Sequence, residues 1–375
     1  GASSGTARET EPGPRSVAER EVDQGDRACF NGRVRLPDSQ DFNRVQLFLA
    51  RRMELKKRAL ITGISGQDGS YMADFLVGKG YDVHGLVRWS ANNNTSRIAH
   101  LLTKNAITIH HGDVNDSARI EAVVATVRPD EIYHFAAQSH VGVSFSQPEY
   151  TLQVTGLGTL RLLEAIRKVD SRIKFYQASS SELFGNMPPP QNESTPFRPE
   201  SPYGVAKVAA YHATRLYRDA YGIFAVNGIL FNHESERRGE EFVTRKITVG
   251  LARIKAGLAN ELVLGNLDAR RDWGYAPEYM EAVWRMMHYE RPEDFVIATG
   301  ESHSVQEFLE QAFGQVGLNW RNHVRVDPSE LRPRDVNTLV GDTSKARLLL
   351  GWEPRVKFPE LVRIMVSSDL KRFGP

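Results

Sequence analysis

A glycine-rich turn between a buried strand and a helix constrains the fold of this chain most strongly. The run Ala59–Ile64 is apolar enough for a buried strand, and an apolar periodic segment typical of a helix follows at Tyr71–Val77. Between them the glycines are spaced as Gly63-x-x-Gly66-x-x-Gly69. Glycines let a backbone approach a pyrophosphate closely, and the first amides of the helix attract its charge. The sequence therefore predicts a βαβ unit that binds a dinucleotide, although another glycine-rich βαβ turn would look the same.

Strand and helix patterns continue to alternate after this unit. Apolar runs typical of buried strands occur at Asp82–Arg88, Ile107–Asp113, Glu131–Ala137, Ile173–Ser179 and Phe224–Phe231. Helices are expected over Asp116–Val127 and, as one long helix, over Glu149–Lys168. Such alternation is typical of a parallel sheet with helices on both faces. We therefore expect an α/β protein with a Rossmann-type doubly wound parallel sheet.

Helices predominate toward the C-terminus. They are expected over Arg245–Ala256, Pro277–Tyr289, Val305–Val316 and Pro359–Leu370, with a strand at Phe295–Gly300. We therefore expect a dinucleotide-binding Rossmann domain over residues 57–231 and a smaller α/β substrate-binding domain over residues 232–375, interleaved with the first. Residues 1–56 form an N-terminal extension that begins rich in Glu, Arg, Ser, Gly and Pro, and it is expected to be largely disordered.

Composition excludes several classes of protein. The apolar fraction of 41%, the charged fraction of 25% and the net charge of +2 are those of a soluble globular protein without nucleic-acid partners. No apolar run is long enough to span a membrane. Cys29 is the only cysteine, which excludes an intrachain disulfide and a cysteine-built metal site. His110, His111 and His134 are not spaced as ligands of one metal. The expected compartment is the reducing cytosol.

Tyr203 and Lys207 form a candidate catalytic pair. Ser201 can cap a helix, and Pro202 fits its first turn because proline has no amide to leave unpaired. Tyr203 and Lys207 then lie one helical turn apart on the same face. A nearby ammonium lowers the pKa of a phenol, so Tyr203 is a candidate base for an alcohol proton. A surface helix with an ordinary Tyr and a solvated Lys would give the same spacing, so this pattern alone is weak.

Polar residues follow the ends of other predicted strands. The strand Ile173–Ser179 delivers Ser180 and Glu182 to the carboxyl edge of the sheet, where ligands of doubly wound folds bind. The strand at residues 82–88 ends in Arg88, where NAD enzymes commonly carry an acid for the ribose 2′-hydroxyl. Because an arginine can bind a 2′-phosphate, NADP is the expected cofactor, unless Arg88 is an ordinary solvent-facing residue.

Together these motifs resemble those of the GDP-mannose 4,6-dehydratases, which are extended short-chain dehydrogenase/reductases. The resemblance runs from about Arg58 to Leu370 and includes the spacing of the glycine turn. The other stretches that carry it are Thr62–Ser70, Ala137–Val141, Gly158–Glu164, Gly228–Ser235, Phe242–Ile247, Leu264–Ala269 and Arg271–Gly274.

The resemblance implies an NADP-dependent lyase that converts GDP-mannose to GDP-4-dehydro-6-deoxymannose and water, for synthesis of GDP-fucose, GDP-rhamnose and related deoxysugars. Tyr203, helped by Lys207, would remove the proton of the 4-hydroxyl while hydride passes to NADP. Glu182 would take the carbon 5 proton and then help the carbon 6 hydroxyl leave, after which hydride returns to carbon 6. Ser181 stands where the dTDP-glucose dehydratases carry an acid, so one carboxylate would do both tasks.

The same resemblance assigns residues to three parts of one site. Catalytic residues would be Ser180, Glu182, Tyr203 and Lys207. Cofactor contacts would be Gly63, Gly66, Gln67, Asp68, Gly69, Arg88, Asp113, Val114, Ala137, Gln138, Tyr150, Lys207, His233 and Arg238. Contacts to the GDP-sugar would be Ser139, Asn232, Lys246, Arg271 and Arg332, since cations and an amide suit a diphosphate. Any single cation could instead be an ordinary surface residue, and Asn232 an ordinary capping residue.

The chain departs from the family pattern at a few positions. Ser180 stands where Thr is usual, and loss of the methyl that restricts its rotamer is expected to slow turnover. Trp89 replaces the Arg that usually follows Arg88, which bears on how tightly the 2′-phosphate binds. The loop Ser90–Arg97 is altered from the version that joins dimers into tetramers in relatives, so a homodimer and a homotetramer both stay open. Glu236 replaces a usual Pro and adds a negative charge close to the cofactor.

Other interpretations are compatible with part of this pattern. A relative that acts on another GDP-sugar, such as a GDP-heptose dehydratase, or a 4-reductase would share most of the motifs. A non-enzymatic scaffold that only binds the cofactor would be expected to lack Tyr203, Lys207 or Glu182, and all of these residues are present.

Overall fold

The computed structural model describes residues 56–91 and 94–374. Most of the expected N-terminal extension, residues 1–56, lies outside the described residues, as does Cys29. Over the described ranges, no helix combines the length and the apolar character needed to cross a membrane.

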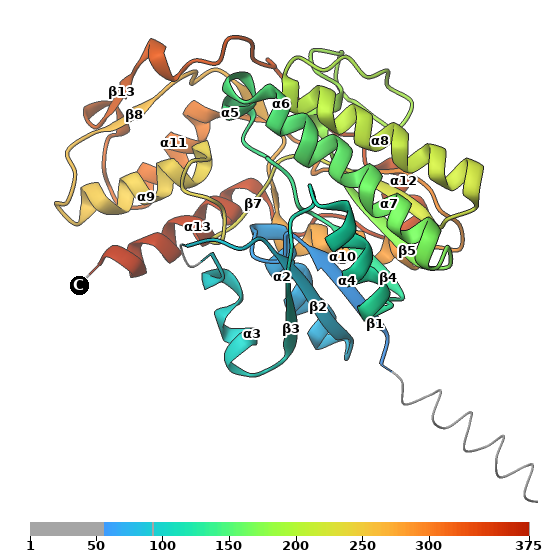
Figure 1. Ribbon diagram of the computed structural model, residues 1–375. Helices are drawn as coiled ribbons and strands as arrows, with labels where there is room; N and C mark the ends of the chain where they lie inside the picture. The colour runs from blue at the N-terminus through green and yellow to red at the C-terminus, as the bar shows by residue number, and fades with distance from the viewer. Residues whose placement is uncertain (1–55, 92–93, 375) are drawn as a thin grey trace, which may run out of the picture. The chain divides into compact units, whose positions relative to one another are not determined.

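A seven-stranded parallel sheet lies at the centre of the described part (Figure 1). Its strand order is β11-β6-β5-β4-β1-β2-β3. The strands are β1 (Arg58–Thr62), β2 (Asp82–Val87), β3 (Ile107–His111), β4 (Glu131–His134), β5 (Lys174–Ser180), β6 (Ala225–Leu230) and β11 (Phe295–Ile297). The order reverses at β1, which pairs with β2 on one side and β4 on the other. This arrangement confirms the predicted Rossmann-type fold and places the expected ligand edge at the carboxyl ends of these strands.

Successive residues of each strand face two different helical layers. Leu60 belongs to an apolar cluster with Val124 of α4, whereas Ile61 belongs to a second cluster with Met72 of α2 and Val283 of α10. The main helices around the sheet are α2 (Gln67–Gly78), α4 (Ser117–Val127), α7 (Gly158–Val169), α8 (Pro202–Tyr221) and α10 (Ala276–Met287). Because both faces of the sheet are covered, its strands appear in the sequence as continuous apolar runs.

The long helix predicted over Glu149–Lys168 is present without a break in the helical backbone, but its middle is a π-helix instead of an α-helix. The segment consists of α6 (Pro148–Thr151), the π-helix η2 (Leu152–Leu157) and α7. The hydroxyl of Thr155, within the π-helix, accepts a hydrogen bond from the amide of Gln138 at 3.1 Å. A Cβ on Gly156 would lie 3.4 Å from the carbonyl oxygen of Ala206. The bulge therefore lies where the helix contacts both the loop after β4 and helix α8, which periodicity cannot reveal.

The chain after β6 builds a second apolar core and also returns to the main sheet. Trp273, Phe308 and Met365 share this core, which includes residues of α9 (Val243–Lys255), α11 (Val305–Gly314) and α13 (Phe358–Phe373). Short sheets pair β7 (His233–Glu234) with β10 (Gly274–Tyr275), β8 (Leu262–Leu264) with β13 (Val324–Val326), and β9 (Arg270–Arg271) with β12 (His303–Ser304). Strand β11 pairs with β6, and α10 packs on α2. The domain boundary at residue 231 stays a prediction.

Several short elements have no counterpart in the sequence prediction. They are the helices α3 (Ala99–Thr103), α5 (Val141–Ser146) and α12 (Ser344–Leu350), and the 3₁₀ turns η1 (Ser96–Ile98), η3 (Ser181–Leu183), η4 (Trp320–Asn322) and η5 (Pro328–Glu330). Elements of this length are too short to show a reliable period. Two of them follow strands of the main sheet: η3, after β5, carries Glu182, and α5, after β4, begins directly after His140.

A buried carboxylate stabilises the amino-terminal edge of the sheet. The side chain of Glu131 is 1% exposed and accepts hydrogen bonds from Lys57 Nζ at 3.1 Å and from the Tyr133 hydroxyl at 2.7 Å. His288 Nε2 lies 3.2 Å from the same carboxylate. Burial alone would raise the pKa of Glu131, but the hydrogen bonds and charges of these neighbours lower it to about 2.

We expect the stability that Glu131 provides to be present at neutral pH and to be lost as the pH falls from 4.5 to about 2, because its folded-state pKa lies below the unfolded value. Glu131→Gln should lower the free energy of unfolding at neutral pH by about 3 kcal/mol and flatten its pH dependence in that range. Urea denaturation across pH measures both effects.

The matched control is Glu121→Gln, which removes an exposed partner of Lys168. It should change the free energy of unfolding by less than about 0.5 kcal/mol. Identical pH dependence in wild type and Glu131→Gln would show that the ionised carboxylate does not stabilise the sheet.

Candidate functional site

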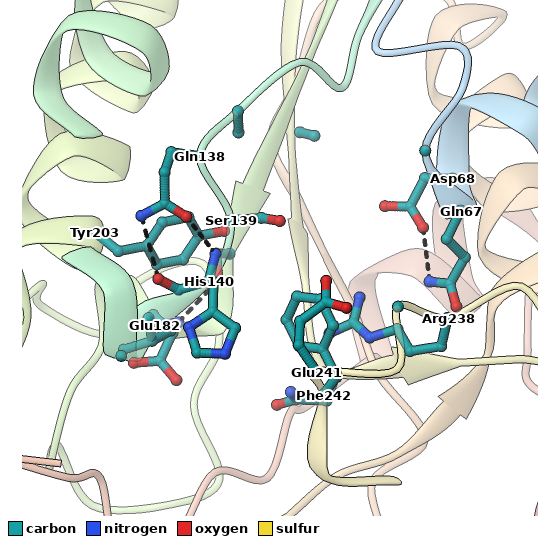
Figure 2. A pocket seen from close by; sticks show the side chains of 18 of the residues that line it. Gln67, Asp68, Gln138, Ser139, His140, Glu182, Tyr203, Arg238, Glu241 and Phe242 are labelled. Carbon is teal, nitrogen blue, oxygen red and sulfur yellow. Dashed lines mark hydrogen bonds between the residues drawn. The ribbon is translucent and has the colours of Figure 1, made fainter. Parts of the chain in front are cut away.

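A cavity of about 1100 Å³ lies at the carboxyl end of the sheet, and every site residue predicted from the sequence lines it. The turn after β1 and the start of α2 contribute Gly63, Gly66, Gln67, Asp68 and Gly69, and the segments after β2, β3 and β4 contribute Arg88, Asp113, Val114, Ala137, Gln138 and Ser139. Helix α6 contributes Tyr150, the end of β5 and η3 contribute Ser180 and Glu182, and helix α8 contributes Tyr203 and Lys207. The chain after β6 contributes Asn232, His233, Arg238, Lys246, Arg271 and Arg332. Figure 2 shows Gln67 and Asp68 on one side of the cavity and Gln138, Tyr203 and Glu182 on the other.

The glycine turn has no room for side chains. Gly63 has a φ of +72°, and a Cβ there would lie 2.7 Å from the amide nitrogen of Ala136. A Cβ on Gly69 would lie 2.3 Å from the carbonyl oxygen of Gly63. In the described part of the chain, Gly66 caps helix α2 without a side-chain hydrogen bond, so the first amides of the helix are available to an anion. These features suit a phosphate group held against the backbone.

Arg88 and Tyr150 meet in the lining of the cavity. The guanidinium of Arg88 donates a hydrogen bond to the hydroxyl of Tyr150 at 2.6 Å. Close by in the lining, Asp113 accepts a hydrogen bond from the amide of Asn115 at 2.9 Å, and Val114 is buried. Trp89 is 78% exposed and its ring lies edge-on to His111, 4.7 Å between centroids. Of the two neighbours Arg88 and Trp89, only Arg88 is among the residues that line the cavity.

The side chain of Gln138 shapes the loop after β4. Its amide nitrogen donates to the hydroxyl of Thr151 at 3.0 Å and to the carbonyl of His140 at 3.2 Å, and its oxygen accepts from the amide of His140 at 2.7 Å. These bonds fix the loop against α6. Gln138 therefore shapes the cavity wall whether or not it also contacts a cofactor.

Helix α8 begins as the sequence predicted. The hydroxyl of Ser201 accepts a hydrogen bond from the amide of Gly204 at 3.1 Å, and Pro202 occupies the first turn. Tyr203 and Lys207 are 8% and 4% exposed. The cap and the proline thus direct both side chains into the cavity instead of toward solvent.

The sequence analysis expected the charge of Lys207 to lower the pKa of Tyr203, whereas in this structure burial raises that pKa. Lys207 Nζ donates a hydrogen bond to the carbonyl oxygen of Ala178 at 2.5 Å and lies 5.7 Å from the centre of the Tyr203 ring. Burial raises the pKa of Tyr203 above its ordinary value, although a hydrogen bond with Ser180 acts in the opposite direction. Burial also lowers the pKa of Lys207 to about 8, while the charge of Asp68 raises it. The sequence argument weighed the charge of Lys207 but not the desolvation of the phenol. The catalytic role of the pair stays a prediction.

Ser180 connects Glu182 with Tyr203. Its hydroxyl oxygen accepts a hydrogen bond from the amide of Glu182 at 3.2 Å, and its side chain also hydrogen-bonds with Tyr203. Glu182 is 7% exposed and lines the cavity. The end of β5 therefore brings a hydroxyl, a carboxyl and a phenol together, which is a suitable set for moving protons.

A hydrogen-bonded group at the start of α2 joins the two halves of the chain. His233 Nε2 lies 3.0 Å from Asp68 Oδ2, and the amide of Gln67 donates to Asp68 Oδ1 at 2.9 Å. The hydroxyl of Ser235 donates to Gln67 Oε1 at 2.8 Å. Arg238 forms an ion pair with Glu234 at 3.1 Å. Residues after β6 thus hold the side chains that follow the glycine turn.

The cations predicted to bind a diphosphate already have carboxylate partners. Lys246 Nζ donates to Glu330 at 2.8 Å. Arg271 and Arg332 both donate to Asp335 Oδ1, at 3.0 and 3.3 Å. The acids come from one short segment, residues 330–335, which the sequence analysis did not connect with these cations.

The sequence analysis did not predict some of the residues that line the cavity. Arg97 donates to the carbonyls of Arg237 at 2.7 Å and Ser65 at 3.4 Å, which places a cation beside the glycine turn. His140 Nδ1 accepts a hydrogen bond from the amide of Val143 at 3.1 Å as the cap of α5, and its ring lies against Phe242. Position in the motif Ala137–Val141 could have suggested His140, whereas the contacts of Arg97 depend on the tertiary fold. Within the described residues, no group of three or more His, Cys, Asp or Glu side chains is arranged to hold a metal ion.

Similar proteins identify the family. The family described as GDP-mannose 4,6 dehydratase matches residues 60–365. The protein named GDP-mannose 4,6 dehydratase 2 of Arabidopsis thaliana is 54% identical over 329 residues, which cover 85% of this chain and 88% of that protein. The GDP-mannose 4,6 dehydratase of Homo sapiens is 50% identical over 339 residues, which cover 84% of this chain and 91% of that protein.

Solved structures share the fold. The UDP-glucose 4-epimerase of Thermus thermophilus in complex with NAD is 27% identical, with a TM-score of 0.72 over 83% of this chain and 98% of that chain. RMD from Pseudomonas aeruginosa complexed with NADPH is 22% identical, with a TM-score of 0.70 over 84% of this chain and 100% of that chain. The match over residues 60–365 and the identity of about half of the aligned residues show that this chain belongs to the GDP-mannose 4,6-dehydratase family, a nicotinamide-binding branch of the short-chain dehydrogenase/reductases.

Proposed function

We propose that this chain dehydrates GDP-mannose to GDP-4-dehydro-6-deoxymannose with NADP as its cofactor, and that Ser180, Glu182, Tyr203 and Lys207 are its catalytic residues. The observation that carries the proposal is the convergence of a glycine turn, a buried Tyr–Lys pair and a buried carboxyl group on one cavity. The dehydration itself agrees with the identity of about half of the aligned residues to relatives of that name.

The residues at the glycine turn fit a dinucleotide, and Arg88 favours NADP over NAD. A Cβ at Gly63 or Gly69 would fill the space beside the backbone that a pyrophosphate needs. Arg88 and Tyr150 offer a cation and a hydroxyl at the position expected for a 2′-phosphate. Solved neighbours include complexes with NAD and with NADPH, so the choice depends on Arg88. A cofactor held by the glycine turn and Arg88 would supply reversible hydride transfer, from carbon 4 of the hexose and back to carbon 6.

Tyr203 is the proposed base for the proton of the 4-hydroxyl. Its buried phenol needs nearby donors and positive charge to become a phenolate. The hydrogen bond with Ser180 and the charge of Arg238 act in this direction. Lys207, one helical turn away with a pKa of about 8, would supply further positive charge when it turns toward the phenol in the complex with substrate. The slower turnover expected from Ser180 in place of Thr stays a prediction.

Glu182 is the proposed acid and base for carbons 5 and 6. A ketone at carbon 4 acidifies the proton on carbon 5, which a carboxylate can then remove. The same group, now protonated, can donate to the carbon 6 hydroxyl as it leaves as water. Ser180 holds the amide of Glu182 at 3.2 Å, which supports a fixed position for the side chain at the end of β5.

The GDP moiety is proposed to bind the cations on the second half of the chain. Lys246, Arg271 and Arg332 would contact the diphosphate through charge-assisted hydrogen bonds, with Asn232 and Ser139 as neutral partners. Each cation would exchange its bond to Glu330 or Asp335 for a phosphate oxygen. The affinity for the GDP-sugar then depends on how much more strongly these cations bind phosphate than they bind Glu330 and Asp335.

We also propose that the enzyme acts in the cytosol as a homodimer or homotetramer. A chain with Cys29 as its only cysteine suits a reducing compartment. The loop Ser90–Arg97 leaves both oligomeric states open.

The purified enzyme is expected to convert GDP-mannose to a 4-keto sugar without net consumption of NADPH, because hydride returns to the same molecule. The absorbance of the keto sugar in alkali and the absorbance of NADPH measure the two quantities. GDP-heptose offered under the same conditions should react at least about tenfold more slowly, by the usual cost of a misplaced substrate group. Stoichiometric consumption of NADPH would instead identify a reductase.

Glu182→Gln is expected to abolish dehydration while GDP-mannose still reduces the bound cofactor, since oxidation at carbon 4 precedes removal of the carbon 5 proton. Product formation should fall by at least about a thousandfold, the upper part of the range for one acid/base group. Stopped-flow absorbance follows the reduced cofactor and the keto-sugar assay follows product. Full activity of this variant would exclude Glu182 from the mechanism.

Lys246→Met and Glu330→Gln are expected to have opposite effects, because Glu330 competes with phosphate for Lys246. Lys246→Met should raise KM for GDP-mannose about tenfold, and Glu330→Gln should lower it about two- to fivefold, with kcat little changed in both. Steady-state kinetics at fixed ionic strength measures the effects. Glu310→Gln, a change at an exposed acid paired with Arg321, is the control. A higher KM in Glu330→Gln would mean that the acid orients Lys246 and does not compete for it.

A further inference from the structure

The ring of Phe242 connects the two walls of the cavity. It lies between His140 and Arg238, and all of these residues line the cavity (Figure 2). The ring centroids of Phe242 and His140 are 5.5 Å apart, with 48° between the ring planes. The central carbon of the Arg238 guanidinium lies 3.7 Å from the centroid of the Phe242 ring. His140 follows β4, whereas Arg238 and Phe242 follow β7, so this stack joins segments that are far apart in the sequence.

The guanidinium of Arg238 is held on one face and at one edge. The Phe242 ring covers the face, at a distance well within the range of a cation–π contact. At the edge, Nε lies 3.1 Å from Oε2 of Glu234, whose side chain is 2% exposed. The hydroxyl of Thr244 donates a hydrogen bond to the same carboxylate oxygen at 2.6 Å, which keeps the acid in place.

The outer nitrogens of Arg238 remain available. Among the described residues, none accepts a hydrogen bond from Nη1 or Nη2 of Arg238. Lys246, Arg271 and Arg332, by contrast, donate to acids on the segment 330–335. Arg238 therefore presents a planar pair of donors to the cavity, which is the geometry that suits two oxygens of a phosphate group.

Phe242 is itself fixed from two directions. Its carbonyl oxygen accepts a hydrogen bond from the amide of Lys246 at 2.7 Å, in the first turn of α9. From across the cavity, its ring packs on His140, whose Nδ1 accepts a hydrogen bond from the amide of Val143 at 3.1 Å. Gln138 bonds to both the amide and the carbonyl of His140. The aromatic surface below Arg238 thus has a defined position.

We propose that Phe242 is a positioning residue for ligand binding: its ring, packed on His140, presents the outer nitrogens of Arg238 to the diphosphate of a nucleotide in the cavity. The proposal rests on the proposed function in taking NADP and GDP-mannose as the ligands of this cavity. Both carry a diphosphate, so the shared chemistry is that of a phosphate group bound by an arginine. Arg238 touches the phosphate, and Phe242 acts through Arg238.

The effect of the ring follows from the freedom of an arginine side chain. A free arginine loses much rotamer freedom when a ligand orders it, and this loss reduces the affinity. A ring that already holds the guanidinium lowers this cost before the ligand arrives. Leucine at position 242 keeps an apolar side chain but has no aromatic face for the cation, so Phe242→Leu removes the restraint.

The chain contains a matched control pair outside the cavity. At the end of α13, the guanidinium of Arg372 lies 4.9 Å from the centroid of the Phe373 ring, and Arg372 also pairs with an acid, Glu240. Neither Arg372 nor Phe373 is among the described residues that line the cavity. Phe373→Leu therefore removes a ring from an Arg–Phe pair without changing the ligand site.

The first experiment is calorimetric titration of the full chain, freed of bound nucleotide, with NADPH and separately with GDP. Phe242→Leu is expected to raise Kd about tenfold for the nucleotide whose diphosphate Arg238 contacts. Phe242→Tyr, which keeps the ring, and Phe373→Leu should both stay within about twofold of the wild type. The nucleotide that shows the rise identifies the source of the diphosphate. An unchanged Kd for both nucleotides in Phe242→Leu would overturn the proposal.

The second experiment tests whether Phe242 acts through Arg238. Arg238→Gln should weaken binding of the same nucleotide, and the double variant Arg238→Gln/Phe242→Leu should bind within about twofold of Arg238→Gln alone. Losses that multiply in the double variant would show that Phe242 supports the cavity independently of Arg238 and would overturn the proposal. A chain that meets these binding expectations but does not dehydrate GDP-mannose would contradict the proposed function and leave the role of Phe242 in place.

Discussion

The close approach of the glycine turn to the end of β4 is the constraint on which the rest of the site depends. A Cβ on Gly63 would lie 2.7 Å from the amide of Ala136, so the turn lies directly on the neighbouring strand end. Helix α2 therefore begins at the sheet edge, and its first turn carries Gln67 and Asp68 to the cavity wall. Their partners His233 and Ser235 come from beyond β6. One backbone contact thus fixes the place where the two halves of the chain meet.

Charge compensation explains how so many cations can line one cavity. Lys246 is paired with Glu330, and Arg271 and Arg332 share Asp335. The side chain of Arg271 is only 9% exposed, so its charge would carry a large desolvation cost if it were unpaired. The ion pair with Asp335 offsets this cost. In the proposed complex a diphosphate would replace one anion with another, so the number of cations would overstate the affinity for the GDP-sugar. The acids lie on one segment, residues 330–335, so one stretch of chain partners all of these cations.

Residues that depend on local sequence were predictable, and residues that depend on tertiary contacts were not. The cap at Ser201, the strand β1 and the turn at Gly63 each have a local signature, and the structure has them where expected. The π-helix at Leu152–Leu157 depends on contacts with the loop after β4 and with α8, so periodicity predicted a regular α-helix there. The bond of Lys207 to Ala178 and the acids opposite the cations join residues far apart in sequence. The sequence therefore predicted which residues line the cavity better than it predicted what they contact.

Burial acts on Tyr203 and Lys207 in opposite directions, and this explains why the site needs charges beyond the pair itself. It raises the pKa of the phenol and lowers that of the amine, so both effects favour the neutral forms that cannot assist each other. A short hydrogen bond to Ala178 helps the ammonium only as a dipole. The charge of Asp68 acts against the effect of burial on Lys207, and Figure 2 shows Asp68 on the side of the cavity opposite Tyr203.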